Sequence, residues 1–335
     1  MAGRGLAGHK SPRYRRPAKK PVSVPVKSGF ESWPFPTYLV TNPTGHFMVS
    51  FGKNEERRSR HPMLSMAEGG GVPKVRVNDI QMNYEVNGEG FPLVMIMGLG
   101  GNLDWWDPRM IQRLSKNFKT IMFDNRGTGR TDVSDREYTI RLFADDTAAL
   151  MDGLGISRAH VLGISMGGMI AQELALNYPQ KVEKLVLCST LCGGEKSVLP
   201  SGVAMGSLTA DRSTMSQEEV AKMVIPIILT EDFVKKNPDY VELLMQQILK
   251  APISDEPYRR QLSAVLEFNT HDRLPQVKSP TLILCGKKDI LVPPGNGPVL
   301  AEAIPNSRLV YLEGSAHALA EDMDEVINLV TGFLG

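Results

Sequence analysis

The stretch VLGISMGGMI, residues 161–170, decides the fold of this chain. It holds Ser165 between Gly163 and Gly167 in a Gly-x-Ser-x-Gly pattern, which is typical of a serine nucleophile on a sharp turn. The chain has 31 glycines in 335 residues, so the pattern alone is a weak signal. Its sequence context must distinguish a nucleophile from a chance match.

The residues on either side of Ser165 predict a strand that runs directly into a helix. AHVLGIS (159–165) is β-rich and apolar, and MGGMIAQELALNYP (166–179) has a helical pattern that ends before Pro179. A serine at such a turn adopts a strained backbone that projects its oxygen above the sheet, and the close helix requires small neighbours. The context therefore favours a nucleophile.

Outward from this turn, β-rich runs alternate with helical patterns, as expected for a mainly parallel sheet with helices on both faces. Helical patterns cover residues 138–155 and 321–334. The strands are expected at residues 72–79, 80–88, 91–98, 118–125, 159–165, 182–190, 279–289 and 307–314. The sequence therefore predicts an α/β fold with a mostly parallel eight-stranded sheet, in which residues 91–98 and 279–289 are central strands.

The β-rich runs disappear between about residues 195 and 270, where helical signals replace them. Ser216 and Glu219 have the spacing of a capping box, and Pro238 stands at the start of another amphipathic helix. We expect residues 195–270 to form a helical cap inserted into the sheet domain. The cap would divide that domain into a first part, residues 67–194, and a second part, residues 271–335.

A basic, proline-rich segment precedes the first strand. Residues 1–62 hold 12 Lys or Arg and 3 Glu, whereas residues 63–335 hold 26 Lys or Arg and 34 Asp or Glu. No sustained period of 2 or 3.6 occurs there, so residues 1–66 are expected to be a disordered leader. Without an apolar h-region it does not resemble a secretory signal. A tail for anionic surfaces or nucleic acid, a transit peptide, and an upstream extension that the working protein lacks all stay open.

The composition limits the classes of partner and cofactor that this chain is expected to bind. The longest apolar runs fall short of the roughly 20 residues that cross a bilayer, so no membrane partner is expected. The six histidines show no metal-ligand spacing, and we expect neither a metal nor another cofactor. Three cysteines without a pairing pattern favour a reducing compartment, and thus a cytoplasmic location. No nucleic-acid partner is expected, and nothing indicates a homo-oligomer.

A serine hydroxyl needs a base to activate it and an acid to orient that base, and in this fold the order along the chain is nucleophile, acid, base. Asp289, in CGKKDILVPP, lies at the end of a predicted strand. His317, in LEGSAHALAED, lies on the loop after the last strand. The alternatives are a turn aspartate and a solvated loop histidine. Order and spacing favour a triad of Ser165, Asp289 and His317.

Rivals for the acid and the base fit this order less well. His160 precedes the nucleophile, and His271 precedes the strand that carries Asp289. Glu195 is the first carboxylate after the strand before the cap, but it stands several residues past the expected strand end, in a glycine-rich exit. We therefore predict that Asp289, and not Glu195, orients the base.

The developing oxyanion needs two backbone N–H donors, one after the nucleophile and one in the loop after the third strand. These donors would be Met166 and Leu99, the latter in MGLGGNLDWWD (97–107). The alternative for this loop is a plain strand-to-helix turn, and its glycines are too few for a dinucleotide fingerprint. We expect Gly98 and Trp106 to contact the substrate, with Trp105 beside them in the acyl pocket.

Residues 75–335 resemble the α/β-hydrolase superfamily, and MGLGG, FDNRGTGRTD (123–132), GISMGG, GKKDILVPP and GSAH look like its carboxylesterase and enol-lactonase-like branch. The resemblance implies the same triad and the same oxyanion donors. Many relatives carry His-Gly where this chain has Met97-Gly98, so an imidazole that would support the oxyanion loop is missing. Serine at 165 instead of aspartate argues against the haloalkane dehalogenase and epoxide hydrolase branches.

These observations together predict a cofactor-free serine hydrolase that cleaves a small carboxylic ester or lactone through an acyl-enzyme intermediate. The first alternative is an acyltransferase or a C–C bond hydrolase that uses the same triad. A more remote alternative is a non-catalytic ligand receptor on the same scaffold.

Overall fold

The structure is a computed structural model that describes residues 40–41, 47–48, 73–200 and 202–335. The chain divides into two units, Met1–Met63 and Leu64–Gly335. In the first unit, β1 (Val40–Thr41) pairs antiparallel with β2 (Phe47–Met48). The rest of the predicted basic leader lies outside the described residues.

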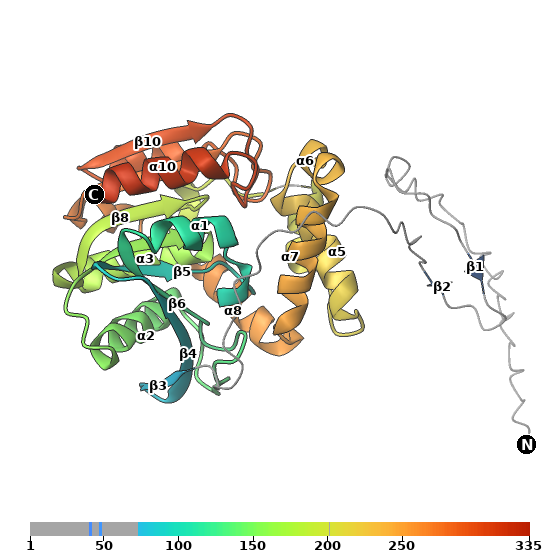
Figure 1. The fold of residues 1–335 in the computed structure, drawn as a ribbon, viewed down its shortest axis with the longest axis horizontal. Coiled ribbons are helices and arrows are strands. Elements are labelled where there is room, and N and C mark those ends of the chain that lie inside the picture. Colours follow the sequence, from blue (N-terminus) through green and yellow to red (C-terminus); the bar gives the residue numbers. More distant parts are fainter. Residues whose placement is uncertain (1–39, 42–46, 49–72, 201) are drawn as a thin grey trace, which may run out of the picture. The chain divides into compact units, whose positions relative to one another are not determined.

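The second unit is built on one eight-stranded sheet with the order β10-β9-β8-β7-β5-β6-β4-β3 (Figure 1). Its strands are β3 (Lys74–Val77), β4 (Ile80–Asn87), β5 (Phe91–Ile96), β6 (Phe118–Phe123), β7 (Ala159–Ile164), β8 (Val182–Cys188), β9 (Thr281–Gly286) and β10 (Ser307–Leu312). Pairs β3-β4 and β4-β6 are antiparallel, and the other five pairs are parallel. The predicted mostly parallel sheet is confirmed, and each strand lies within its predicted range.

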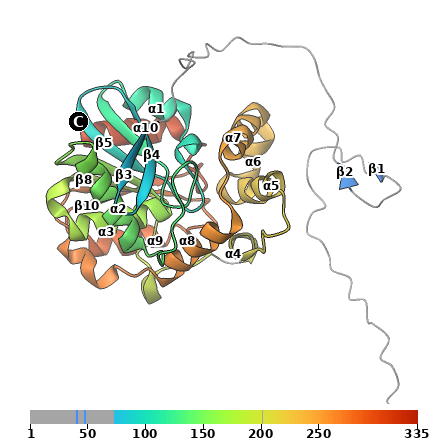
Figure 2. The same cartoon turned by 90° about the horizontal axis from the view of Figure 1, so that it is seen from below.

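Helices cover both faces of the sheet, which explains why its inner strands are apolar runs (Figure 2). One face carries α2 (Ile140–Gly153), α3 (Met166–Asn177) and α9 (Asn296–Ala303), and the other carries α1 (Pro108–Leu114) and α10 (Met323–Leu334). Side chains of β5 alternate between the two: Val94 and Ile96 pack in the first core cluster, and Leu93 and Met95 in the second. The core therefore consists of two apolar layers on either side of the sheet.

The position of β9 differs from the sequence prediction. It was expected at the centre of the sheet, but it lies second from the β10 edge. All six of its residues are nevertheless buried, because α9 and α10 cover its two faces. Burial on both faces makes an apolar run whether or not the strand is central, so the run could not reveal its place in the order.

Five helices follow β8 and precede β9, within the segment predicted as a cap. They are α4 (Gly202–Thr209), α5 (Gln217–Ile228), α6 (Glu231–Lys236), α7 (Pro238–Lys250) and α8 (Asp255–Glu267). Figure 1 shows α5, α6 and α7 together at one side of the sheet. Their apolar faces form a separate cluster that includes Ile225, Leu244 and Ile248 and also takes in Ala320 from the loop after β10. The helices thus pack against the loops at the carboxyl edge of the sheet.

Capping side chains set the starts of α5 and α2, and the capping box at α5 was predicted from the sequence. Ser216 and Glu219 form the reciprocal capping box at α5, and the Thr139 hydroxyl accepts from the Leu142 N–H, 3.0 Å away, at α2. Short 3-10 turns complete the fold: η1 (Leu103–Trp105), η2 (Pro179–Lys181), η3 (Gly194–Lys196) and η4 (His271–Gln276). In the described ranges, no helix combines the length and apolar character that a membrane span requires.

Candidate active site

Ser165 occupies the junction between β7 and α3, in a backbone conformation that few non-glycine residues adopt. Its φ is 57° and its ψ is −123°. Three contacts hold it there: its N–H donates to the Cys188 carbonyl (2.9 Å), and its own carbonyl accepts from the Gly168 N–H (2.9 Å) and the Thr190 hydroxyl (2.7 Å). Strain that its surroundings enforce in this way is typical of functional positions.

The glycines around Ser165 allow β5, β7 and α3 to approach one another at the backbone. A Cβ at Gly163 would lie 2.2 Å from the Gly167 carbonyl oxygen. A Cβ at Gly167 would lie 2.0 Å from the Ile96 carbonyl oxygen. Both distances are far shorter than atomic contact permits, so the sharp turn at Ser165 requires glycine at these positions.

Asp289 and His317 lie on the loops that follow β9 and β10, two parallel neighbours whose carboxyl ends meet at one edge of the sheet. The His317 Nδ1 lies 2.8 Å from the Asp289 Oδ2. The other oxygen, Oδ1, accepts from the backbone N–H groups of Leu291 and Val292, each at 2.8 Å. The carboxylate is therefore fixed in place, and it favours the ring tautomer with the proton on Nδ1 and a bare Nε2.

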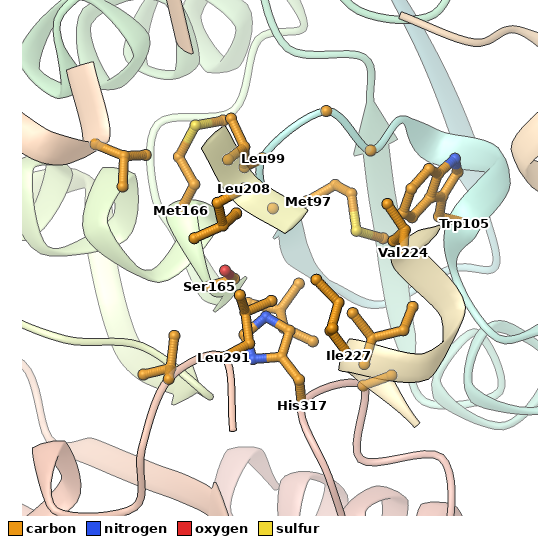
Figure 3. Close-up of a pocket in the computed structure, with 18 of the residues that line it drawn as sticks. Met97, Leu99, Trp105, Ser165, Met166, Leu208, Val224, Ile227, Leu291 and His317 are labelled. Atoms are coloured by element: carbon orange, nitrogen blue, oxygen red, sulfur yellow. The ribbon is translucent and has the colours of Figure 1, made fainter. Parts of the chain in front are cut away.

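Ser165 and His317 line the same cavity, which has a volume of about 520 Å³ and lies between the sheet and the cap helices. Figure 3 shows the two side chains facing the same space, with Leu99 and Met166 bordering it near the serine and Ile227 of the cap across from them. The hydrogen bonds of the described residues include the one between His317 and Asp289 but none between Ser165 and His317. Such contacts are often loose in an enzyme without substrate.

Both predicted oxyanion donors border this cavity beside the serine. Met166 is the first residue of α3, so its N–H has no acceptor within the helix and lies at the positive end of the helix dipole. Among the loop and turn hydrogen bonds of the described residues, none uses the N–H of Leu99 or Met166. Gly98 is close enough that a Cβ there would lie 3.0 Å from the Ser165 Cβ. The two N–H groups are thus available to a ligand.

Two side chains support the loop that carries Leu99. The Asn125 amide donates to the Met97 carbonyl (3.0 Å). Gln261 of α8 is completely buried; its oxygen accepts from the Gly100 N–H and its amide donates to the Arg126 carbonyl, both at 3.0 Å. Helix α8 therefore helps to fix the loop that carries Leu99.

Asp124 anchors the far end of the same loop. Its Oδ1 accepts from the Leu103 N–H (2.8 Å), and its Oδ2 accepts from the Arg130 N–H and the Asn83 amide, both at 2.8 Å. Burial raises the pKa of this carboxyl group, and these hydrogen bonds oppose the rise. Asp124 and Asn125 belong to the FDNRGTGRTD stretch that the sequence already singled out, whereas no sequence signal indicates Gln261.

The cavity wall is mainly apolar and comes from both the sheet domain and the cap. Trp105 and Trp106 both line it, and each indole Nε1 is buried without a partner among the described residues. The side chain of Trp106 also belongs to the core cluster of α1 and α10. Leu208, Val224 and Ile227 line the wall from the cap.

The rivals to the predicted triad lie in other surroundings. His160 is buried on β7 against Phe91, with ring centroids 4.7 Å apart. His271 lies 3.0 Å from the exposed Asp272 beside it. Glu195 borders the cavity but is exposed and forms no hydrogen bond with His317. Within residues 73–200 and 202–335, no group of three His, Cys, Asp or Glu is arranged to hold a metal ion.

Comparison with known proteins places this geometry in a family. A family model described as alpha/beta hydrolase fold matches residues 92–323. RutD of Azorhizobium caulinodans, provisionally named a carbamate hydrolase, is 28% identical over 279 residues, which are 79% of this chain and 98% of that protein. The enol-lactonase of Burkholderia xenovorans LB400 is 28% identical, with a TM-score of 0.69 over 78% of this chain and 99% of its own. A thermophilic esterase of Thermogutta terrifontis is 25% identical, with a TM-score of 0.68 over 79% and 98%.

Proposed function

Because this chain belongs to the α/β-hydrolase fold family and is a hydrolase, we propose that it cleaves a small carboxylic ester or lactone through an acyl-enzyme intermediate on Ser165. One observation carries the proposal. His317, held at 2.8 Å by Asp289, shares a cavity with a serine that stands on a strained turn beside two free N–H groups. These are the parts that acyl transfer requires.

In the first half of the reaction, the Ser165 oxygen attacks the carbonyl carbon of the substrate while its proton passes to Nε2 of His317. The negative charge that develops on the carbonyl oxygen is stabilised by the N–H groups of Leu99 and Met166. Asp289 stabilises the imidazolium that forms. The bond between the carbonyl carbon and the alkoxy oxygen then breaks, and the leaving alcohol takes the proton from His317.

In the second half, water attacks the acyl-Ser165 ester while His317 accepts one of its protons. The tetrahedral intermediate collapses, the bond to the serine oxygen breaks, and His317 returns the proton to that oxygen. A carboxylic acid leaves the site. With a lactone as substrate, the alcohol stays joined to the acyl group and the product is one hydroxy acid.

Two observations support an ester or a lactone over other hydrolase substrates. The names of the solved structures reported above include an enol-lactonase and an esterase. The mainly apolar cavity wall also suits an uncharged acyl chain and its carbonyl. We propose a cytoplasmic location on the separate ground that Cys188, Cys192 and Cys285 are free and buried.

The test is hydrolysis of p-nitrophenyl butyrate by the purified full chain, with and without EDTA. We expect turnover that EDTA does not change, and its loss in Ser165→Ala. Ser263→Ala, at an exposed serine of α8, is the matched control and should keep full activity. An active Ser165→Ala protein, shown to be free of other esterases, would contradict the proposal.

A further inference from the structure

Arg212 is a cation in the wall of the mainly apolar cavity. It lies in the loop between α4 and α5, and among the described residues that line the cavity it is the only lysine or arginine. Its Nη2 donates to the Tyr258 hydroxyl (2.8 Å) and to the Ser207 carbonyl (3.3 Å). Its guanidinium carbon lies 3.5 Å from the centroid of the Tyr258 ring. The side chain is therefore held in one orientation.

No carboxylate pairs with this guanidinium among the described residues. Its Nε is buried without a partner, and its Nη1 forms no hydrogen bond there. Asp255 acts on it only at a distance: one Asp255 oxygen pairs with Arg259 at 2.8 Å, and the other is buried without a partner. Burial lowers the pKa of Arg212. A buried cation with free donors and no counter-ion gains free energy when an anion pairs with it.

The other charged residues of the cavity do not neutralise Arg212. Asp107 pairs with Arg109 at 2.7 Å and accepts from the Tyr240 hydroxyl at 3.2 Å. Glu195 is exposed. The wall thus offers an incoming carboxylate one unpaired positive group in otherwise apolar surroundings.

Tyr258 connects Arg212 to the oxyanion loop. A Cβ at Gly100 would lie 3.3 Å from the Tyr258 Cδ2, so the ring packs directly on this loop. The N–H of Gly100 is in turn held by Gln261, one turn along α8 from Tyr258. An anion bound at Arg212 would thus lie about one aromatic ring from the loop that carries Leu99. A chain of a few carbons bridges such a distance.

We propose that Arg212 binds a free carboxylate of the substrate, so that the preferred substrate is an acidic half-ester or a lactone acid whose carboxylate lies a few carbons from the scissile carbonyl. This inference rests on the proposed hydrolysis at Ser165. The inference adds the requirement that the substrate carries a negative charge, which an apolar cavity alone would not impose. Guanidinium suits the role because it can bind a carboxylate through two parallel N–H groups.

The test compares monomethyl adipate with dimethyl adipate, which differ by one charge, in the full chain and in Arg212→Gln. We expect the variant to lower kcat/KM for the half-ester by about 10- to 100-fold, the effect of losing a charge-assisted hydrogen bond, and to change kcat/KM for the diester by less than about twofold. Lys250→Gln is the control, because Lys250 is an exposed cap cation outside the cavity wall. It should change neither value.

Two results would overturn the inference and leave the proposed function standing. One is a kcat/KM that is equal for the two esters both before and after the substitution, and the other is an equal loss of kcat/KM for both esters in Arg212→Gln. A wild-type protein that cleaves neither ester would count against the proposed function. Calorimetry of adipate binding to Ser165→Ala then tests independently whether Arg212 binds an anion. Binding that disappears in Ser165→Ala/Arg212→Gln supports the site, and the absence of binding, or binding unchanged by the second substitution, refutes it.

Discussion

Replacing Asp289 with asparagine tests how His317 is oriented, because the structure dictates which way the new amide must face. The present Oδ1 accepts from two backbone N–H groups, those of Leu291 and Val292. An asparagine NH₂ in that place would oppose two donors, so the amide oxygen must remain there. The NH₂ group then faces Nδ1 of His317, which lies 2.8 Å from the present Oδ2. A donor at this point requires Nδ1 to accept, which moves the ring proton to Nε2.

An imidazole that carries its proton on Nε2 cannot take one from Ser165. By analogy with serine proteases, in which the same change misplaces the proton, we expect kcat near pH 7 to fall about 10³- to 10⁴-fold. This fall corresponds to about 4 to 5.5 kcal/mol in the activation free energy. The assay is the steady-state hydrolysis of p-nitrophenyl butyrate, with thermal unfolding and near-UV circular dichroism to verify the fold.

Glu195→Gln is the matched control, because Glu195 is the rival acid and forms no hydrogen bond or ion pair with His317 among the described residues. It should change kcat by less than about threefold. The reasoning is refuted if folded Asp289→Asn keeps more than about a tenth of the wild-type kcat, or if Glu195→Gln loses more than Asp289→Asn does.

Three further outcomes are expected. Gly167→Ala places a methyl group 2.0 Å from a backbone carbonyl and should destabilise the fold by about 1 to 3 kcal/mol or more in urea unfolding, whereas Gly332→Ala, with open space around it, should not. Gln261→Leu removes the acceptor for the Gly100 N–H and should lower kcat about 10-fold with little change in KM; an unchanged kcat would show that the loop does not need this support. Burial is the main cause that lowers the pKa of His160 from 6.5 to about 4 in the folded protein. Between these two pH values the unfolded chain binds a proton at His160 and the folded chain does not, so the free energy of unfolding falls as the pH drops from about 6.5 to about 4. Between pH 7 and 4.5, the free energy of unfolding of His160→Leu should therefore fall by about 2 to 3 kcal/mol less than that of the wild type, as measured by denaturant titration. Equal decreases in the two proteins would contradict the shift in the pKa of His160.

The sheet could be predicted from the sequence because its physical signals are local. Strands buried on both faces appear as short apolar runs, and the helices between them have a 3.6-residue period with capping residues at their starts. The same signals cannot give the order of strands in the sheet, which is why β9 was expected at the centre and lies near the edge. Order depends on contacts between segments far apart in the chain.

The candidate triad could be predicted from order and spacing, since the turn at Ser165 and the loops after β9 and β10 each have a recognisable pattern. Two residues beside the site, Gln261 and Arg212, could not be predicted in this way. Gln261 and Gly100 are separated by 161 positions, and an α8 glutamine resembles any helical surface residue in sequence. No sequence signal indicated Arg212 either, because an arginine in a loop is usually solvated. Only the packing of the cap shows that Gln261 holds the loop that carries Leu99 and that Arg212 lines the cavity.

The central claim is that Ser165 is the nucleophile, and active-site labelling tests it most directly. The full chain is treated with a fluorophosphonate, digested, and the modified residue is located by mass spectrometry. We predict one adduct per chain, on Ser165, which Ser165→Ala abolishes and Asp289→Asn slows. A stoichiometric adduct on any other serine, or full labelling of Ser165→Ala, would contradict the account.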